Sequence, residues 1–417
     1  MKKNQIALLI AALGVWLIAM PLTFGYSGDA VGISDLISGL LLIVFGLLSQ
    51  ATNRMWSGWF AGIIGLWLQL APIIFWAPNS LMYINDTLIG AISIILSFRL
   101  VQKKTVAKEA EIPAGWSYNP SGWSHRVPVV GLAILCWFFA RYMAAYQLGY
   151  IDAIWDPIFK NGTLHVITST ISMDFPVSDA GMGAVCYTLE ALLGWQGDTR
   201  RYASMPWLVF AFAFLVIPVG IASITLIILQ PVVVGAWCSW CLATALSMLL
   251  MIVLTGGELA AACQVLKEAK KKGESVWKVL WKGTDATPGK QKKSFHKKSG
   301  GWGVTLPWNL CFSFLLGIWL MASSSVLGID QGLATVNYIL GPLVAAISII
   351  ALSEALRSVR YFNFLLGVCL VIAPWFVAHS GTLSIVNNIL VGLIILVCAF
   401  PKGRISERYG TWQRLIF

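Results

Sequence analysis

The sequence predicts an all-α protein that crosses a membrane about twelve times. Of its 417 residues, 58% are hydrophobic and 11% are charged, whereas a soluble domain carries about 25% charged residues. Many of the 20 tryptophans lie near the ends of apolar segments, where aromatic belts meet a membrane surface. The apolar segments have lengths near the ~20 residues that span a bilayer. They are 5–24, 31–50, 57–76, 81–98, 127–149, 179–195, 205–230, 231–254, 307–328, 333–352, 361–379 and 382–400.

Positive charge predicts the orientation of these segments. Lysine and arginine cluster at the N-terminus, at 99–126, at 267–298 and in the tail after residue 401, while the opposite connections carry little beyond Lys160. By the positive-inside rule, both termini are expected in the cytoplasm, with the protein in a bacterial inner membrane. Because the net charge of +11 lies in these connections, a nucleic-acid partner is not expected.

The first and last quarters of the chain repeat one helical hairpin four times. Its first helix carries Gly-x-Trp-Leu, at Gly14, Gly65 and Gly317, with Cys369 replacing the tryptophan in the fourth copy. Its second helix carries Asp or Asn four residues before a glycine. These positions are Asp35, Asp86, Asn337 and Asn388. Small residues let two helices approach closely. The polar residues are expected to be helix N-caps or to bond across the hairpin; the alternative is an ion or proton path.

These hairpins resemble the SPW repeat family, which is named for a Ser-Pro-Trp motif. The motif reads Ala71-Pro72-Ile73 and Ala373-Pro374-Trp375, and the third copy has serines at 323–325 without proline. The resemblance implies a fold and no particular activity. The predicted domains are an N-terminal repeat pair (1–103), a cytoplasmic linker (104–126), a four-helix bundle (127–255), a basic cytoplasmic linker (256–305), a C-terminal repeat pair (306–402) and a cytoplasmic tail (403–417).

The basic linker after residue 255 predicts contact with lipid headgroups. Apolar residues such as Val276 and Trp281 alternate there with Lys267, Lys270–Lys272 and Lys278, and a Lys/Gly/Ser tract follows at 288–299. A basic amphipathic segment beside a membrane is typical of binding to anionic lipids. The alternative is a dedicated binding site.

Of the eight cysteines, Cys238 and Cys241 have a spacing that indicates redox chemistry. Three residues apart on one face of a helix, they can close a disulfide. We expect the helix to begin near Val232, with this pair one or two turns below its start. The other interpretation is two small packing residues. Cysteine and histidine nowhere have the spacing of zinc ligands, so no metal is expected.

A second motif begins the second helix of the bundle. Pro176 stops any preceding helix, and Ser178 or Asp179 is a natural N-cap. Cys186 and Tyr187 are expected at a depth similar to that of the cysteine pair. The run from Ser178 to Leu189, followed by Cys238-Ser239-Trp240-Cys241, resembles the vitamin K epoxide reductase family over the whole of 127–255.

The resemblance implies electron transfer between thiols and a membrane quinone, either ubiquinone or menaquinone. Cys238 and Cys241 would be the catalytic pair, with Cys241 facing the quinone and Cys238 exchanging with a thioredoxin-like or other external dithiol. The implied quinone-binding residues are Asp179, where the family has Asn, together with Gly183, Tyr187, Trp237 and Trp240. Ser178 and Cys186 are auxiliary candidates. Cys186 is interpreted as a packing residue; the alternative is that it replaces a shuttle cysteine.

Two features depart from the family pattern. The connection 149–177 contains no cysteine, whereas the family has a second cysteine pair there, and Ala245 replaces an aromatic residue. The predicted function is a membrane thiol–disulfide oxidoreductase that couples the Cys-x-x-Cys dithiol to a lipid quinone at the outer face. The alternative is a membrane scaffold or small-molecule-binding protein with a degenerate, non-catalytic reductase fold. A transporter is less favoured because intramembrane charges are few.

Overall fold

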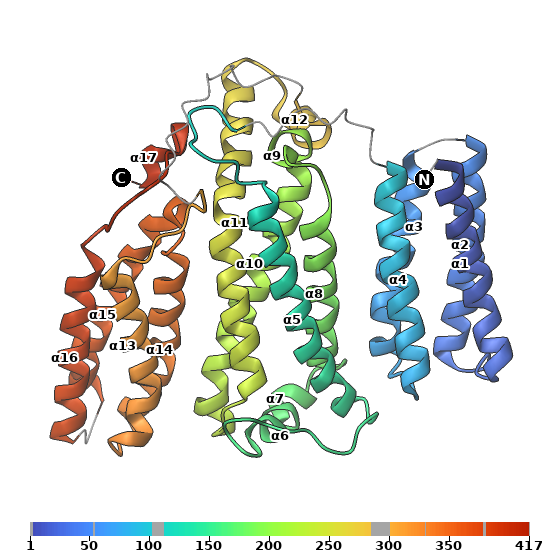
Figure 1. Ribbon diagram of the computed structural model, residues 1–417. Helices are drawn as coiled ribbons and strands as arrows, with labels where there is room; N and C mark the ends of the chain where they lie inside the picture. Colours follow the sequence, from blue (N-terminus) through green and yellow to red (C-terminus); the bar gives the residue numbers. More distant parts are fainter. Residues whose placement is uncertain are drawn as a thin grey trace. The chain divides into compact units, whose positions relative to one another are not determined.

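The computed structural model describes residues 3–52, 55–101, 112–284, 301–329, 331–377 and 381–416. Within these ranges the chain forms helices and turns without a β-strand, and eleven helices are long and apolar enough to cross a membrane (Figure 1). The remaining predicted segment is α8 (Asp179–Trp195), a shorter helix of 17 residues. The predicted all-α polytopic class is therefore confirmed.

The chain divides into two compact units. Unit 1 contains Met1–Ala107, Trp137–Asp156 and Ile167–Leu192, and unit 2 contains Lys108–Cys136, Pro157–Val166 and Leu193–Phe417. The helix α5 (Trp123–Gln147) begins in unit 2 and ends in unit 1, and α8 lies almost entirely in unit 1.

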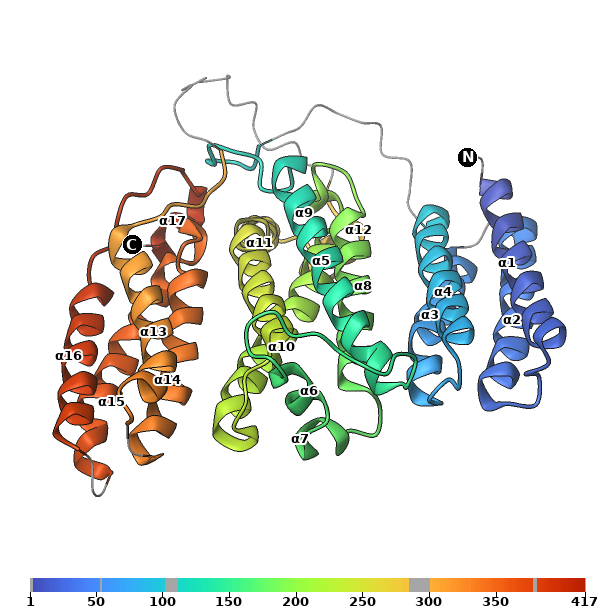
Figure 2. The same cartoon turned by 60° about the horizontal axis from the view of Figure 1, so that its bottom comes forward.

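In unit 1, the N-terminal repeats form two helical hairpins, visible in Figures 1 and 2. The first pairs α1 (Lys3–Phe24) with α2 (Ala30–Thr52), and the second pairs α3 (Met55–Ile74) with α4 (Ser80–Val101). The predicted close approach is present in both. A Cβ on Gly14 would lie 2.4 Å from the Gly39 oxygen, and one on Gly65 would lie 2.7 Å from the Gly90 oxygen. These crossings therefore require glycine.

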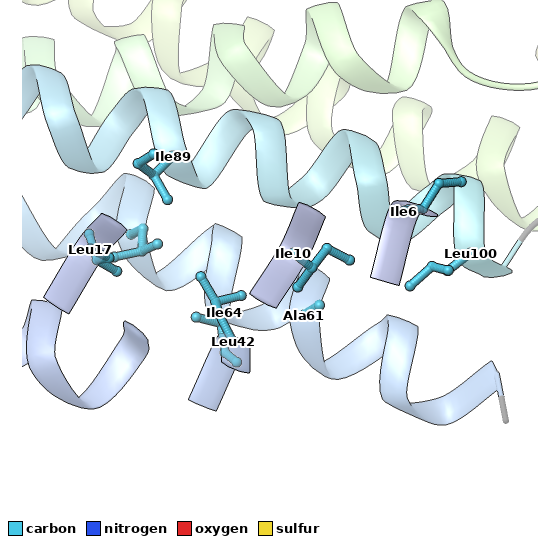
Figure 3. Packing of buried hydrophobic residues seen from close by; sticks show 9 residues of the cluster. Ile6, Ile10, Leu17, Leu42, Ala61, Ile64, Ile89 and Leu100 are labelled. Atoms are coloured by element: carbon cyan, nitrogen blue, oxygen red, sulfur yellow. The ribbon is translucent and has the colours of Figure 1, made fainter. Parts of the chain in front are cut away.

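The two N-terminal hairpins are joined by reciprocal hydrogen bonds. Trp16 Nε1 on α1 donates to Asn85 Oδ1 on α4 at 3.0 Å, and Trp67 Nε1 on α3 donates to Ser34 Oγ on α2 at 2.9 Å. Between the hairpins, buried aliphatic side chains form the apolar core that Figure 3 shows from close by. It consists of Ile6, Ile10, Leu17, Leu42, Ala61, Ile64, Leu68, Ile89 and Leu100. Equivalent tryptophans thus bind the copies into one pair.

The N-cap interpretation of the repeated Asp and Asn residues is wrong. Asp35 and Asp86 lie several residues inside α2 and α4, and both are fully buried. Asn337 and Asn388 lie equally deep in helices of the C-terminal repeats. A residue so far inside a helix cannot bond the free N–H groups of its first turn.

In unit 2, the C-terminal repeats pair α13 (Trp308–Val326) with α14 (Gln331–Ile350), and α15 (Tyr361–Phe376) with α16 (Thr382–Ala399). A Cβ on Gly317 would lie 2.7 Å from the Gly341 oxygen. Trp319 Nε1 donates to Asn387 Oδ1 at 3.0 Å, the bond equivalent to that of Trp16. The leucine that follows each Gly-x-Trp or Gly-x-Cys is fully buried in all four copies: Leu17, Leu68, Leu320 and Leu370.

Unit 2 also contains α10 (Pro206–Leu229) and α11 (Ser239–Lys271), which pack against each other. A buried ion pair joins α9 (Arg201–Ser204) to α11, since Arg201 Nη2 lies 2.6 Å from Glu258 Oε2. Ser121, before α5, donates to Glu258 Oε1 at 2.5 Å. The described part of the first linker is thereby tied to α11.

The helix α11 runs well past the predicted segment end at residue 254. Gly256 and Gly257 do not stop it, because both serve close packing: a Cβ on Gly257 would lie 2.3 Å from the Tyr118 hydroxyl. The expected amphipathic stretch is therefore divided between α11 and the short helix α12 (Val276–Lys282). The tract 288–299 lies outside the described residues. The chain ends with α17 (Gln413–Ile416), after a tail whose Ser406 and Tyr409 donate to the buried Glu354.

Candidate functional site

The predicted cysteine pair forms a disulfide at the start of α11. Cys238 is the N-cap residue of this helix, in an extended backbone conformation, and is bonded to Cys241. The Cys241 N–H donates to Cys238 Sγ, with the two atoms 3.1 Å apart. Cys238 is fully buried, whereas Cys241 is partly exposed. The first turn of α11 therefore directs an N–H group at the sulfur of Cys238.

The break before this disulfide corrects the predicted depth of the pair. No helix starts near Val232; instead α10 is followed by a π-helical turn over Gln230–Val234, and Gly235 then adopts a left-handed φ of 72°. Pro231 removes a backbone donor, and glycine enters the left-handed region at low cost. Cys238 consequently lies at the end of the helix rather than one or two turns inside it.

Gln230 supports the backbone at the disulfide. Its side chain is buried, and Oε1 accepts a hydrogen bond from the backbone N–H of Cys238 at 3.0 Å. An aromatic contact lies next to the disulfide: the ring of Trp237 packs edge-on against Tyr338 on α14. Sequence reasoning missed Gln230. Its signal is an amide in an otherwise apolar run, directly before Pro231.

The segment 157–166 of unit 2 lies against the residue that precedes the pair. At the start of α6 (Gly162–Ile167), a Cβ on Gly162 would lie 2.0 Å from the Trp237 carbonyl oxygen. Only glycine permits this approach. Trp237 and Trp240 are predicted to stack with a quinone. Trp237 precedes Cys238, Trp240 lies between the two cysteines, and both tryptophans are partly exposed.

In unit 1, Gln147 at the end of α5 organises the N-terminus of α8. Of the two predicted N-cap residues, Ser178 caps the helix: its Oγ accepts from the Gly181 N–H at 2.9 Å and donates to Gln147 Oε1 at 2.5 Å. Gln147 Nε2 donates to Asp179 Oδ1 at 2.6 Å and to Ser172 Oγ, in α7 (Thr170–Met173), at 2.8 Å. Gln147 was also missed by sequence reasoning.

The remaining predicted residues follow along α8. Gly183 and Tyr187 are one turn apart on one face, where the nearest atoms to a Cβ on Gly183 would be Ala140 Cβ and Tyr187 Cε2, both at 3.7 Å. Cys186 is a partly buried free thiol. One turn further, Glu190 is fully buried, and neither carboxyl oxygen has a hydrogen-bond partner among the described residues.

The predicted site residues are thus grouped by compact unit. Cys238, Cys241, Trp237 and Trp240 belong to unit 2, and Ser178, Asp179, Gly183, Cys186 and Tyr187 belong to unit 1. Across the described ranges, no set of three His, Cys, Asp or Glu side chains could hold a metal ion.

The predicted site residues of unit 2 fit a quinone better than those of unit 1. On the unit 2 side, the exposed part of Cys241 and the faces of two indoles can meet an apolar ring. On the unit 1 side, Asp179 Oδ1 already accepts from Gln147 and from the Ala180 N–H. A carboxylate accepts and does not donate, so it cannot replace the family's Asn as a donor to a quinone carbonyl. The fit to a quinone therefore lies chiefly with unit 2.

Comparison with known families agrees with the predicted layout. Residues 127–256 match the Vitamin K epoxide reductase family, and residues 4–99 and 307–401 match the SPW repeat domain. No curated protein and no solved structure matches the chain. The reductase family consists of membrane redox enzymes that are associated with quinones and thiol partners. The segment 127–256 is therefore similar to the vitamin K epoxide reductase family, and it is flanked on both sides by segments that match the SPW repeat domain.

Proposed function

We propose that the protein is a membrane thiol–disulfide oxidoreductase that couples Cys238 and Cys241 to a lipid quinone at the outer face of the membrane. One observation carries the proposal: a disulfide between these cysteines lies at a helix N-terminus inside the family segment. The quinone would be ubiquinone or menaquinone, and the partner a thioredoxin-like or other external dithiol.

The two half-reactions balance in electrons and protons. When bound, a quinone supplies an acceptor for two electrons and two protons. Reduced Cys238 and Cys241 would release two electrons and two thiol protons and form their S–S bond. A thiolate of the external dithiol would then attack this bond, pass through a mixed disulfide and leave as a disulfide, returning both cysteines to thiols.

The proposed roles of the two cysteines follow from their surroundings. As the N-cap residue, Cys238 accepts the Cys241 N–H, and a helix N-terminus stabilises a thiolate. Cys241 has exposed surface, which suits the residue that faces the quinone. Trp237 and Trp240 would contact the ring. Asp179, Gly183 and Tyr187 on α8 stay predicted quinone-binding residues.

Burial of Cys238 adds a requirement to this scheme. An external dithiol cannot reach a fully buried sulfur, and Gly162 is in contact with the carbonyl of the preceding Trp237. The residues around Cys238 would therefore have to move before thiol exchange at this sulfur. With no cysteine in 149–177, that connection carries no electrons itself.

The same absence of loop cysteines favours the second candidate, a membrane scaffold or small-molecule-binding protein with a non-catalytic reductase fold. In that case the disulfide would only stabilise the start of α11. The two candidates differ in one measurable property, which is turnover of a dithiol with a quinone.

Dithiol-driven quinone reduction by the purified full chain tests the proposal. Cys241→Ser and Cys238→Ser should each abolish turnover, because neither can form the disulfide. Cys311→Ser is the matched control, since Cys311 is a partly buried free cysteine on α13 and should leave the rate unchanged. Equal rates in the parent and Cys241→Ser would refute the oxidoreductase and leave the scaffold.

We also propose that the basic linker rests on anionic lipid headgroups. On α12, Trp277 and Trp281 are 68% and 47% exposed, and Lys278 and Lys282 are exposed beside them. Trp207, near the start of α10, stacks on Trp281. Exposed indoles beside lysines are typical of interfacial helices. In lipid bilayers of mixed composition, the full chain should enrich anionic lipids around itself, and this enrichment should fall when both tryptophans are changed to Ser.

A further inference from the structure

Two carboxyl groups are buried inside the N-terminal repeat pair. Asp35 on α2 and Asp86 on α4 are each 0% exposed, and each carboxyl group has one buried oxygen without a hydrogen-bond partner among the described residues. They occupy the same position in two copies of the repeat, four residues before Gly39 and Gly90, which form the helix crossings. The pairing of the two hairpins therefore buries two acids in the same repeat pair.

The four carboxyl oxygens of Asp35 and Asp86 have too few hydrogen-bond donors. Tyr26 Oη donates to Asp35 Oδ2 at 3.1 Å, and Asn85 Nδ2 donates to Asp86 Oδ1 at 3.3 Å. The amide of Asn85 is held in this orientation, because its Oδ1 accepts from Trp16. The other two oxygens, Asp35 Oδ1 and Asp86 Oδ2, are buried and receive no donor from any described residue. Two ionised carboxylates only accept, so neither oxygen can satisfy the other unless one of the acids carries a proton.

Among the described residues, no cation is hydrogen-bonded to Asp35 or Asp86. Arg141 on α5 donates to Thr87 Oγ1 at 3.3 Å and lies over the ring of Tyr83, 4.8 Å from its centroid. The other neighbours are the phenols of Tyr26 and Tyr150, and the Tyr150 hydroxyl donates to the Ala77 carbonyl. Two adjacent anions without a cation in an apolar interior are strongly disfavoured.

We propose that Asp35 and Asp86 form a proton-binding site in the membrane interior, with one proton shared between the two carboxyl groups. The C-terminal repeats provide an internal comparison, because Asn337 and Asn388 occupy the equivalent positions and carry no exchangeable charge. The first repeat pair would bind and release a proton where the second cannot. This site is independent of the redox function proposed for the cysteines.

Infrared spectroscopy of the full chain in lipid bilayers tests the proposal directly. The carbonyl stretch of a protonated carboxylic acid should be present at neutral pH in the parent. It should lose one component in Asp35→Asn and the same component in Asp86→Asn, because the asparagine amide supplies the missing donor and leaves the remaining acid ionised. Asp29→Asn is the matched control, since Asp29 is exposed, and should change nothing. Any band from Glu190 should persist in all three variants.

Folding and ion controls complete the test. Asp35→Asn combined with Asp86→Asn reproduces the asparagines of the C-terminal repeats, so it should fold, lack the component and unfold near the parent's temperature. A component that survives in this double variant would overturn the proposal. Stabilisation of the parent by sodium but not by potassium at neutral pH, absent from the double variant, would also overturn it, because the pair would then hold a metal cation.

Discussion

The side-chain amide of Gln230 accepts a hydrogen bond for which no helical carbonyl is available, because the helix is interrupted between α10 and α11. The π-helical turn and Gly235 leave the N–H of Cys238 outside any helix, and Gln230 Oε1 accepts it in a buried position. We predict that Gln230→Leu lowers the free energy of unfolding by about 1–3 kcal/mol, the cost of a buried unpaired donor.

Gln230→Glu is the matched control for that prediction, because it retains an acceptor oxygen at the same distance along the side chain. Thermal unfolding of both variants should place Gln230→Glu closer to the parent. If Gln230→Leu were as stable as the parent, the amide would have no supporting role at the disulfide.

Cys186 is either a packing residue or a shuttle that passes electrons to Cys238 and Cys241. It is a partly buried free thiol on α8, without a second cysteine near it in sequence. We predict that Cys186→Ser keeps most of the dithiol-driven quinone reduction, because serine has a similar volume and packs in its place. An inactive Cys186→Ser variant with normal stability would instead assign the shuttle role to this residue.

At the scale of elements, the glycine crossings determine how closely each hairpin packs. A Cβ on Gly65 would lie 2.7 Å from the backbone oxygen of Gly90, which cannot move aside as a side chain could. We predict that Gly65→Ala destabilises the protein by about 1–3 kcal/mol, as overpacking does. Gly131→Ala is the control, because no atom lies within 4 Å of its Cβ position. Equal unfolding temperatures for the two variants would contradict the role of the crossing.

The ion pair between Arg201 and Glu258 ties α9 to α11. Both side chains are buried, and Arg201 also donates to the carbonyls of Leu193 and Gly194. We predict that Arg201→Met costs about 3–5 kcal/mol, because it leaves an uncompensated buried charge. Combining it with Glu258→Leu should recover part of the loss in chemical unfolding. No recovery would show that the carbonyl contacts, rather than the charge pair, carry the stability.

At the scale of the whole molecule, the placement of lysine and arginine predicts which connections face outward. Lys160 lies in the connection 149–177, and Lys272 caps the end of α11; both are exposed. In a cysteine-free background, Lys160→Cys should react with a membrane-impermeant thiol reagent in spheroplasts, and Lys272→Cys only in inverted vesicles. The reverse pattern would invert the proposed orientation of the disulfide.

The amino-acid sequence by itself determined the membrane class, the fourfold hairpin, a cap at Ser178 or Asp179 and the cysteine pair. Each of these depends on local pattern: apolar length, repeated glycines, a capping residue after proline, and a three-residue spacing. Such signals are read within one helix or one hairpin. For the same reason the sequence also located the family segment, whose motifs are contiguous.

Only the tertiary structure decided which distant residues complete those motifs. Gln147 reaches Ser178 and Asp179 across a connection, and Gln230 reaches Cys238 across the break between α10 and α11. The pairing of two hairpins buries Asp35 and Asp86 in the same repeat pair. The tertiary structure also moved Cys238 to the start of α11, and moved the repeated acids from expected caps to a buried position. The physical reason is that a buried polar group takes its partner from whatever packing brings near, and no local pattern encodes that partner.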